Sequence, residues 1–344
     1  MPTASGQIPI VLGVDIEPDE RSVDRNHPRP WTGFEQLTAT LTDVRRRVTA
    51  QTGRTVRFSW FVRMDPQVAE TYGDPAWFVK RHTDLVEQWL TAGDDIGVHP
   101  HTYRWDAARG AWLIERTDQE WVDRCIRTSF AAFEAVFHRA SYAYRMGDRS
   151  LSNASLALAE TLGARIDLSV EPGYIESPGI FRHELQTGTL PDYTHAPQWP
   201  YQPSPADFLR PDPTAARRIW MLPVSTWRVT PLLRLPRRLY LELRTLRRKP
   251  VPDDLKMQST VTLSLALPPR LFRRIVDDLL RRSERPYLVA MDRSDIGTTP
   301  HKLERIARNI SGLLSHPLAD RFVFTRPQEA LEILGCTARS EAAA

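Results

Sequence analysis

The fold is decided by one short stretch, Asp94-Asp95-Ile96-Gly97-Val98-His99-Pro100-His101-Thr102-Tyr103. Ile96 and Val98 predict a short buried strand, and two histidines follow it directly. In extended backbone, residues two positions apart point to the same side, so the imidazoles of His99 and His101 converge. A helix is excluded because Pro100 lies between them. The pattern suits a divalent metal ion, and it also suits two partly solvated loop histidines.

Composition places the chain among ordinary folded proteins. Of its 344 residues, 41% are hydrophobic and 26% are charged. The net charge of +4 is too small to indicate nucleic-acid binding, which needs a concentrated basic patch. Cys125 and Cys336 are too few and too far apart for a disulfide framework or a cysteine-rich metal site. Without a signal-peptide pattern or an apolar run of about 18 residues, the chain is expected to be cytoplasmic.

Strands and helices are predicted to alternate along most of the chain. The other strands are expected at 8–14, 55–62, 142–145, 166–170, 219–224, 287–291 and 321–324. The helices are expected at 34–52, 77–90, 117–137, 153–162, 269–282, 303–314 and 326–334. Such alternation predicts a parallel sheet with helical crossovers. The α/β fold class is therefore predicted to be a distorted (β/α)7-8 barrel, with an open doubly wound sheet as the alternative.

The predicted domain is a single barrel over residues 1–336, followed by a disordered tail at 337–344. Residues 105–115 are expected to form a loop. Residues 171–218 are rich in proline and aromatic residues, and they predict a long inserted loop region that could act as a lid. Residues 231–250 predict a basic amphipathic segment, which packs on the barrel, makes peripheral contact with a membrane or binds a phosphate-bearing substrate.

Polar residues close five of these strands, and in a parallel barrel the ends of the strands face one mouth. They are Asp15 and Glu17, His99 and His101, Arg145, Ser225, and Asp292. Two histidines and one carboxylate make a three-ligand site with an open position, which is typical of catalytic zinc. A second carboxylate beside it could act as general base.

In order and position, these motifs resemble those of the polysaccharide deacetylase (NodB-homology) family. The resemblance is to a cytoplasmic branch with Asp-x-Glu and His-x-His motifs, and it covers about residues 8–335. The four motifs are Val14-Asp15-Ile16-Glu17, His99-Pro100-His101, Tyr144-Arg145-Met146-Gly147 and Leu222-Pro223-Val224-Ser225.

The resemblance implies a metal-dependent hydrolase that removes an acetyl group from the nitrogen of an amino sugar or glycoconjugate. Asp15 would be the general base, and Arg145 would orient it, unless Arg145 is only a structural ion-pair partner. The ligands of one divalent metal would be Glu17, His99 and His101, with zinc expected first and cobalt, manganese or nickel as alternatives. The substrate would be a small molecule or an oligosaccharide, and the side chains expected to contact it are Tyr103, Trp105 and Trp227.

Two departures from the family pattern matter. The histidines are spaced i, i+2, where the family usually has i, i+4. Asp292 stands where the family has the histidine that protonates the leaving amine. A carboxyl with an ordinary pKa of about 3.9 is a poor proton donor at neutral pH. Either burial raises the pKa of Asp292, or His183 or His195 takes over its role, or hydrolysis is weak or absent.

The last possibility defines an alternative hypothesis, a catalytically degenerate barrel that binds carbohydrate without hydrolysis. An amidohydrolase-type barrel also uses a His-x-His pair, but there the pair closes the first strand. Here the first strand carries the acids, and the pair follows the third, so this hypothesis ranks lower.

Overall fold

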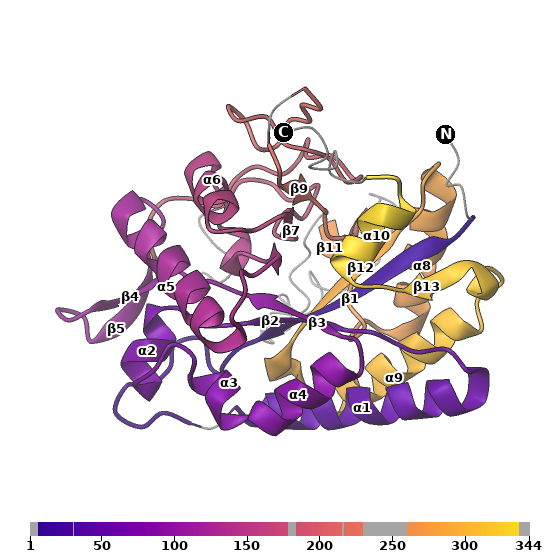
Figure 1. Ribbon diagram of the computed structural model, residues 1–344, viewed down its shortest axis with the longest axis horizontal. Coiled ribbons are helices and arrows are strands. Elements are labelled where there is room, and N and C mark those ends of the chain that lie inside the picture. The colour runs from indigo at the N-terminus through magenta and orange to yellow at the C-terminus, as the bar shows by residue number, and fades with distance from the viewer. Residues whose placement is uncertain (1–5, 30, 178–183, 215–216, 230–259, 337–344) are drawn as a thin grey trace, which may run out of the picture.

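A curled half-barrel of parallel strands forms the centre of the molecule (Figure 1). The computed structural model describes residues 6–29, 31–177, 184–214, 217–229 and 260–336. The sheet order is β12-β1-β2-β3-β6-β7-β9, and β13 also pairs with β1. The strands are β1 (Ile8–Ile16), β2 (Ser59–Val62), β3 (Asp95–Val98), β6 (Ala143–Tyr144), β7 (Ile166–Asp167), β9 (Trp220–Met221), β12 (Leu288–Arg293) and β13 (Phe322–Phe324). This architecture confirms the predicted α/β class and the distorted barrel.

The gap between β9 and β12 is bridged by the chain that follows β9. Leu222 N donates to Asp167 O at 2.8 Å, and on the other side Ser225 N donates to Val289 O at 3.0 Å. The Ser225 hydroxyl also accepts from Val289 N at 2.9 Å. Ser225, one of the polar residues expected at the mouth, therefore helps to close the barrel wall.

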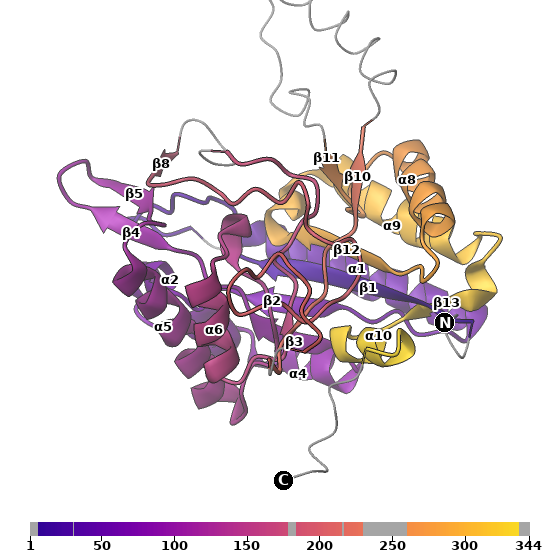
Figure 2. The same cartoon turned by 90° about the horizontal axis from the view of Figure 1, so that it is seen from above.

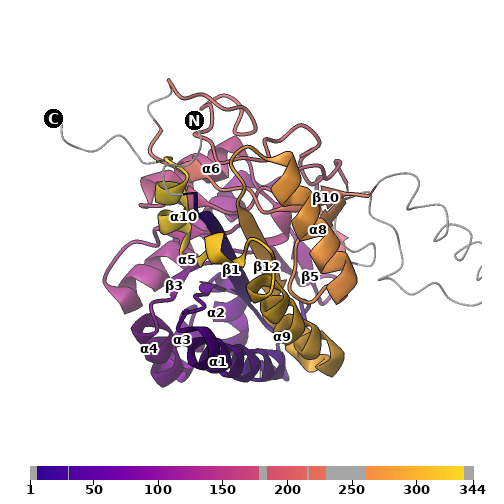
Figure 3. The ribbon, with the colours of Figure 1, turned by 90° about the vertical axis from the view of Figure 1, so that its right-hand side faces the viewer.

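Helices surround the strands, as the end view in Figure 3 shows. They are α1 (Thr32–Thr52), α2 (Pro66–Tyr72), α3 (Trp77–Arg81), α4 (Thr83–Thr91), α5 (Gln119–Phe137), α6 (Asn153–Thr161), α8 (Pro269–Arg282), α9 (Pro300–Leu314) and α10 (Pro327–Ile333). None of the helices in the described ranges is long and apolar enough to cross a membrane.

The first strand and the first helix follow directly from their side-chain patterns. All nine residues of β1 are buried, because one face packs against the covering helices and the other against the inside of the barrel. In α1, Leu37, Leu41, Val44 and Val48 form the buried stripe. Gly53 ends this helix with φ 68°, a left-handed conformation that suits glycine.

The prediction of a loop at 105–115 was wrong. Tyr103–Asp106 forms β4 and Ala111–Ile114 forms β5, and the two pair as an antiparallel hairpin that also holds β8 (Leu185–Gln186). Trp105 lies opposite Trp112, so the hairpin is stabilised by a cross-strand aromatic pair. Figure 2 shows the hairpin projecting from the body at the left of the view. The strands are only four residues long, too short for their alternation to stand out in the sequence.

Two smaller differences concern helix ends. The helix predicted at 77–90 is two helices, because His82, with φ −119°, interrupts it between α3 and α4. The helix predicted at 117–137 begins at Gln119, after its cap Asp118, whose side chain accepts from Trp121 N. A strand pair that was not expected, β10 (Thr226–Arg228) with β11 (Thr260–Thr262), lies beside the barrel mouth.

Close packing of β3 against β6 makes a glycine necessary at position 97. A Cβ atom at Gly97 would overlap the carbonyl oxygen of Ala143 on the neighbouring strand. We expect Gly97→Ala to lower the free energy of unfolding by about 1–3 kcal/mol or more, measured by urea denaturation. The control is Gly312→Ala in α9, where a Cβ meets nothing within 4 Å and should raise the same free energy by about 0.5–1 kcal/mol. Equal effects of the two substitutions would contradict this account.

Candidate active site

A cavity of about 290 Å³ opens where the parallel strands end. Strand register explains its position, because Ile16, Val62 and Val98 are neighbours across β1, β2 and β3. The chains therefore leave the sheet at one level, with Glu17 and His99 as the next residues of β1 and β3. The cavity is lined by five carboxylates, four guanidinium groups, two imidazoles and three other side chains: Asp15, Glu17, Asp148, Glu171, Asp292, Arg21, Arg145, Arg149, Arg293, His99, His101, Tyr174, Thr262 and Met291.

The two histidines face each other through their Nε2 atoms, which are 3.0 Å apart. Nδ1 of His99 lies 2.8 Å from the carbonyl oxygen of Arg145 and must carry the proton, because a carbonyl only accepts. Nδ1 of His101 donates in the same way to the carboxylate of Asp148, at 3.2 Å. Burial lowers the pKa of His99 to about 4 and that of His101 well below its usual value. Both rings are therefore neutral at pH 7, with an Nε2 lone pair on each.

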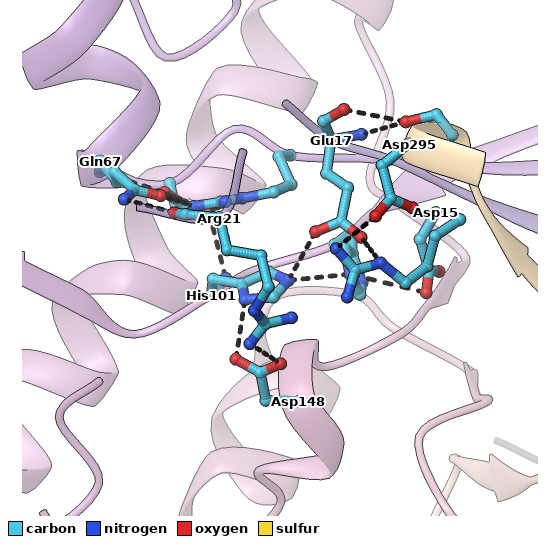
Figure 4. Close-up of polar contacts among 12 residues, drawn as sticks. Asp15, Glu17, Arg21, Gln67, His101, Asp148 and Asp295 are labelled. Atoms are coloured by element: carbon cyan, nitrogen blue, oxygen red, sulfur yellow. Dashed lines mark hydrogen bonds and ion pairs between the residues drawn. The ribbon is translucent and has the colours of Figure 1, made fainter. Parts of the chain in front are cut away.

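Glu17 brings a carboxylate to the same point, as Figure 4 shows for Glu17 and His101. Its Oε2 is 3.6 Å from Nε2 of His101 and has no hydrogen-bond partner within the described part of the chain, although the residue is buried. Its backbone is fixed by Ser294, whose hydroxyl bonds both the N–H and the carbonyl of Glu17. Its Oε1 lies 2.5 Å from Nε of Arg293.

These three groups fit a divalent metal ion. One ligand atom from each of Glu17, His99 and His101 lies within 4.8 Å of the others. On a tetrahedral zinc ion with bonds of about 2.0–2.1 Å, neighbouring ligand atoms are roughly 3.3 Å apart. The observed separations of 3.0 and 3.6 Å bracket that value. Two facing lone pairs beside an unpaired carboxylate oxygen repel one another unless a cation lies between them.

Asp15 lies on the other side of the histidine pair and is bound to Arg145. Arg145 Nε donates to Asp15 Oδ2 at 3.1 Å, and the same guanidinium donates to Leu168 O and to Glu171. Asp15 Oδ2 is also 3.7 Å from Nε2 of His99. Burial raises the pKa of Asp15, and the neighbouring Arg145 opposes that rise. The other oxygen, Oδ1, is buried without a hydrogen-bond partner in the described ranges, so it can accept a proton.

Asp292 reaches the cavity from β12, and no arginine is bonded to it among the described residues. Its oxygens accept from the Ser264 hydroxyl at 2.5 Å and from the backbone N–H groups of Leu265 and Ala266 at 2.9 and 3.3 Å. Burial outweighs these hydrogen bonds and raises the pKa of Asp292 to about 6. Burial therefore raises the pKa of Asp292, as the first of the three possibilities requires.

Of the other two proton-donor candidates, the structure describes only His195, which does not line the cavity. His195 is exposed and lines a different surface pocket, beside Trp199. His183 lies outside the described residues, as do the basic segment 231–250 and the tail 337–344.

The three aromatic residues expected to contact substrate do not line the cavity. Tyr103 is buried beneath it, with its ring stacked on His101 at 5.6 Å. Trp105 packs against Trp112 in the hairpin. Trp227 is buried on β10, with its ring N–H bonded to Asp278 at 2.9 Å. Their apolar surface is used in packing, which is the more common role of large aromatic residues.

Several functional residues around the histidines were not predicted from the sequence. Asp148 bonds both His101 and Arg21, and these neighbours hold the pKa of its carboxyl well below the usual value (Figure 4). Behind His101, the fully buried Arg63 donates to Asp65 at 2.8 Å, and Asp65 accepts from the backbone N–H of His101. Asp148 comes shortly after β6, and Asp15 and Glu17 lie at the end of β1. Its position near a strand end is therefore the sequence signal that could have identified Asp148.

The turn that carries Asp148 has an unusual backbone. Position 147 requires glycine, because a Cβ atom there would overlap the His101 ring. Asp148 and Arg149 both have positive φ, 55° and 58°, a conformation that costs non-glycine residues of order 1 kcal/mol each. The carbonyl of Arg149 accepts from the buried Tyr193 hydroxyl at 2.7 Å, which helps to hold the turn. Strain of this kind tends to occur at functional sites.

Comparison with solved structures identifies the fold. A protein from Parabacteroides distasonis assigned as a glycoside hydrolase or deacetylase matches with 13% identity and a TM-score of 0.57, over 94% of this chain and 70% of that one. A probable polysaccharide deacetylase from Pseudomonas aeruginosa matches with 11% identity and a TM-score of 0.52, over 95% and 91%. An allantoinase matches with 13% identity and a TM-score of 0.50, over 97% and 92%. No protein-family model matches the sequence, and neither does any curated protein.

The raised pKa of Asp292 predicts a pH-dependent stability. Its pKa of about 6 in the folded protein exceeds the value of about 3.8 expected when unfolded, so the folded state favours the protonated form. The resulting penalty is absent below pH 4, grows up to pH 6 and reaches about 3 kcal/mol above it.

The test is urea denaturation of the wild type and Asp292→Asn with a chelator present. We expect the stability of the wild type relative to the variant to fall by up to about 3 kcal/mol between pH 4 and pH 7. A difference that does not vary with pH would contradict the assignment.

Proposed function

We propose that this chain, which has the fold of the polysaccharide deacetylases, is a metal-dependent hydrolase that removes an acyl group, foremost acetyl, from the nitrogen of an amino sugar or glycoconjugate. One observation carries the proposal. Two neutral imidazoles and a buried carboxylate oxygen without a partner converge on one point, next to a second carboxylate. The carbohydrate part of the proposal rests on the assignments of the proteins that share the fold.

We propose that Glu17, His99 and His101 hold the metal ion, with zinc first and cobalt, manganese or nickel as alternatives. Imidazole nitrogen with carboxylate oxygen is a donor set that suits these ions. When bound, such an ion would polarise the amide carbonyl and lower the pKa of water, so that a hydroxide nucleophile is available near neutral pH. The hydrogen bonds from Nδ1 of each ring fix the tautomer that presents Nε2, which is the usual support of a metal-binding histidine.

The remaining groups supply proton transfer and orientation. Asp15 is the general base, because its Oδ1 is free to accept a proton while Arg145 holds Oδ2. Arg145 is a positioning residue, since its three bonds tie Asp15 on β1 to Leu168 and Glu171, which follow β7. Asp292 is the proton donor for the leaving amine, because a carboxyl with a pKa of about 6 stays partly protonated near neutral pH.

Metal binding is the first test of this proposal. We expect Glu17→Gln and His99→Gln to weaken zinc binding roughly a hundredfold or more, since each removes a ligand. Asp148→Asn should cost about 10–100-fold, the usual effect of losing a partner that orients a ligand. The measurement is calorimetric titration of chelator-treated protein with zinc chloride. His195→Gln, which changes an exposed histidine outside the cavity, should bind zinc like the wild type. Wild-type affinity in both ligand variants would overturn the metal site.

Hydrolysis is tested with Asp15→Asn, which keeps the shape of the side chain and removes the base. On N-acetylglucosamine and its oligomers, we expect acetate release to fall by roughly 10²–10⁴-fold while the zinc content is unchanged. Full activity in this variant would refute the role of Asp15. If the zinc-loaded wild type binds these sugars without releasing acetate, the alternative of a carbohydrate-binding barrel replaces the hydrolase.

A further inference from the structure

One arginine in the cavity differs from the others in having no close partner. Arg145 bonds Asp15 and Glu171, Arg21 pairs with Asp148, and Arg293 pairs with Glu17. The guanidinium of Arg149 donates no hydrogen bond to any residue that the structure describes. Its nearest carboxylate oxygen, Oε2 of Glu171, is 4.0 Å away, beyond hydrogen-bond distance.

The neighbouring carboxylates are already engaged. Glu171 Oε1 accepts from Arg145 at 2.8 Å, and Oε2 accepts from the Thr262 hydroxyl at 2.7 Å. Asp292 is occupied by Ser264 and two backbone N–H groups. Glu171, the carboxylate nearest to Arg149, therefore has both of its oxygens occupied by other donors.

The arginine is nevertheless held in one place. Its side chain is only 9% exposed, and its guanidinium stacks on the ring of Tyr174, with Cζ 3.9 Å from the ring centroid. Tyr174 is itself fixed by a hydrogen bond of 3.0 Å to the Thr262 hydroxyl. A guanidinium that lies flat on a ring keeps the N–H groups at its edge available for another partner.

The strained turn adds a second observation. Arg149 has φ 58° directly after Asp148 with φ 55°. A backbone held in this conformation aims the side chain into the cavity that also contains the histidine pair. A buried cation without a hydrogen-bond partner is unfavourable by itself, and an anionic ligand would remove that cost.

The net charge of the cavity lining also favours an anionic ligand when a metal ion is bound. The cavity lining carries five carboxylates and four guanidinium groups, a formal charge of −1 with neutral histidines. A divalent cation in the metal site makes the lining positive by one charge. An anionic group on the ligand would then neutralise the cavity.

We propose that Arg149 is a specificity-determining residue that binds an anionic group, a phosphate or a carboxylate, on the acylated substrate. The inference rests on the proposed function and narrows its substrate class to N-acylated amino sugars that carry a negative charge. The planar guanidinium of Arg149 would donate two parallel hydrogen bonds to two oxygens of the anion, as guanidinium groups do with carboxylate and phosphate.

The test uses three probes that share the N-acetyl group: N-acetylglucosamine, N-acetylglucosamine 6-phosphate and N-acetylmuramic acid, which carries a carboxylate. Binding is measured by calorimetry with the zinc-loaded full chain carrying Asp15→Asn, which suppresses acetate release. We expect this protein to bind at least one anionic probe about 10–100-fold more tightly than the neutral sugar. The better of the two identifies the anion as phosphate or carboxylate.

Variants then assign the preference to Arg149. In Arg149→Gln, the ratio of the affinity for the anionic probe to that for the neutral probe should fall to about one. In Arg149→Lys, the ratio should be partly retained, because lysine keeps the positive charge but cannot donate two parallel hydrogen bonds. The matched control is Arg228→Gln, an exposed arginine on β10 outside the cavity, which should leave the ratio unchanged.

A second pair of variants keeps the arginine in place, in case its substitution disturbs the turn. Tyr174→Phe retains the ring under the guanidinium and should keep the preference, whereas Tyr174→Leu removes the ring and should weaken it. Equal affinity for all three probes, no measurable binding of any of them, or a preference that persists in Arg149→Gln would overturn the inference.

Acetate release by the zinc-loaded protein separates this inference from the proposed function. If acetate is released from neutral and anionic probes with equal kcat/KM, the proposed hydrolase function is supported and the proposed role of Arg149 is wrong. An anionic preference in binding without acetate release from any probe would leave the role of Arg149 and overturn the hydrolase.

Discussion

The structure is organised around three mutually repelling ligand atoms at the mouth of the barrel. Two unprotonated ring nitrogens, of His99 and His101, lie 3.0 Å apart, and a buried carboxylate oxygen of Glu17 lies 3.6 Å from one of them. In a low-dielectric setting such an arrangement is unfavourable without a cation, so the protein must hold it in place by other contacts. The carbonyl of Arg145 and the carboxylate of Asp148 fix the rings, and Ser294 fixes the backbone of Glu17. The hydrogen bonds around the site serve to hold these three repelling atoms close together.

Charged groups at the mouth fall into two kinds. Those in close pairs, such as Arg145 with Asp15 and the fully buried Arg63 with Asp65, neutralise each other and give the site a fixed shape. Asp292 and Arg149 lack such pairs: Asp292 is surrounded by neutral donors, and Arg149 lies on an aromatic ring. Groups of the second kind can exchange a proton or bind a ligand at little structural cost, and the proposed roles of Asp292 as proton donor and of Arg149 as anion-binding residue use them.

The departures from the deacetylase motif pattern have local explanations. His-x-His spacing works because His99 and His101 follow a strand with Pro100 between them, and both Nε2 atoms reach the same point. The acid at position 292 sits in a site whose burial raises its pKa, so a histidine is not the only side chain that could donate a proton there. The fold itself is shared with proteins assigned as deacetylases and with an allantoinase, and it does not select a substrate.

The sequence by itself determined the alternation of strands and helices, the acids after the first strand and the convergence of the two histidines, because each depends on local backbone periodicity. Tertiary structure alone decided which side chains meet. It paired Asp148 with His101, left Arg149 without a close partner and turned Tyr103, Trp105 and Trp227 into packing residues. It also formed a hairpin at 103–114, where the sequence predicted a loop at 105–115. The reason is that strand order, register and burial join residues far apart in the chain, and periodicity within one segment carries no information about them.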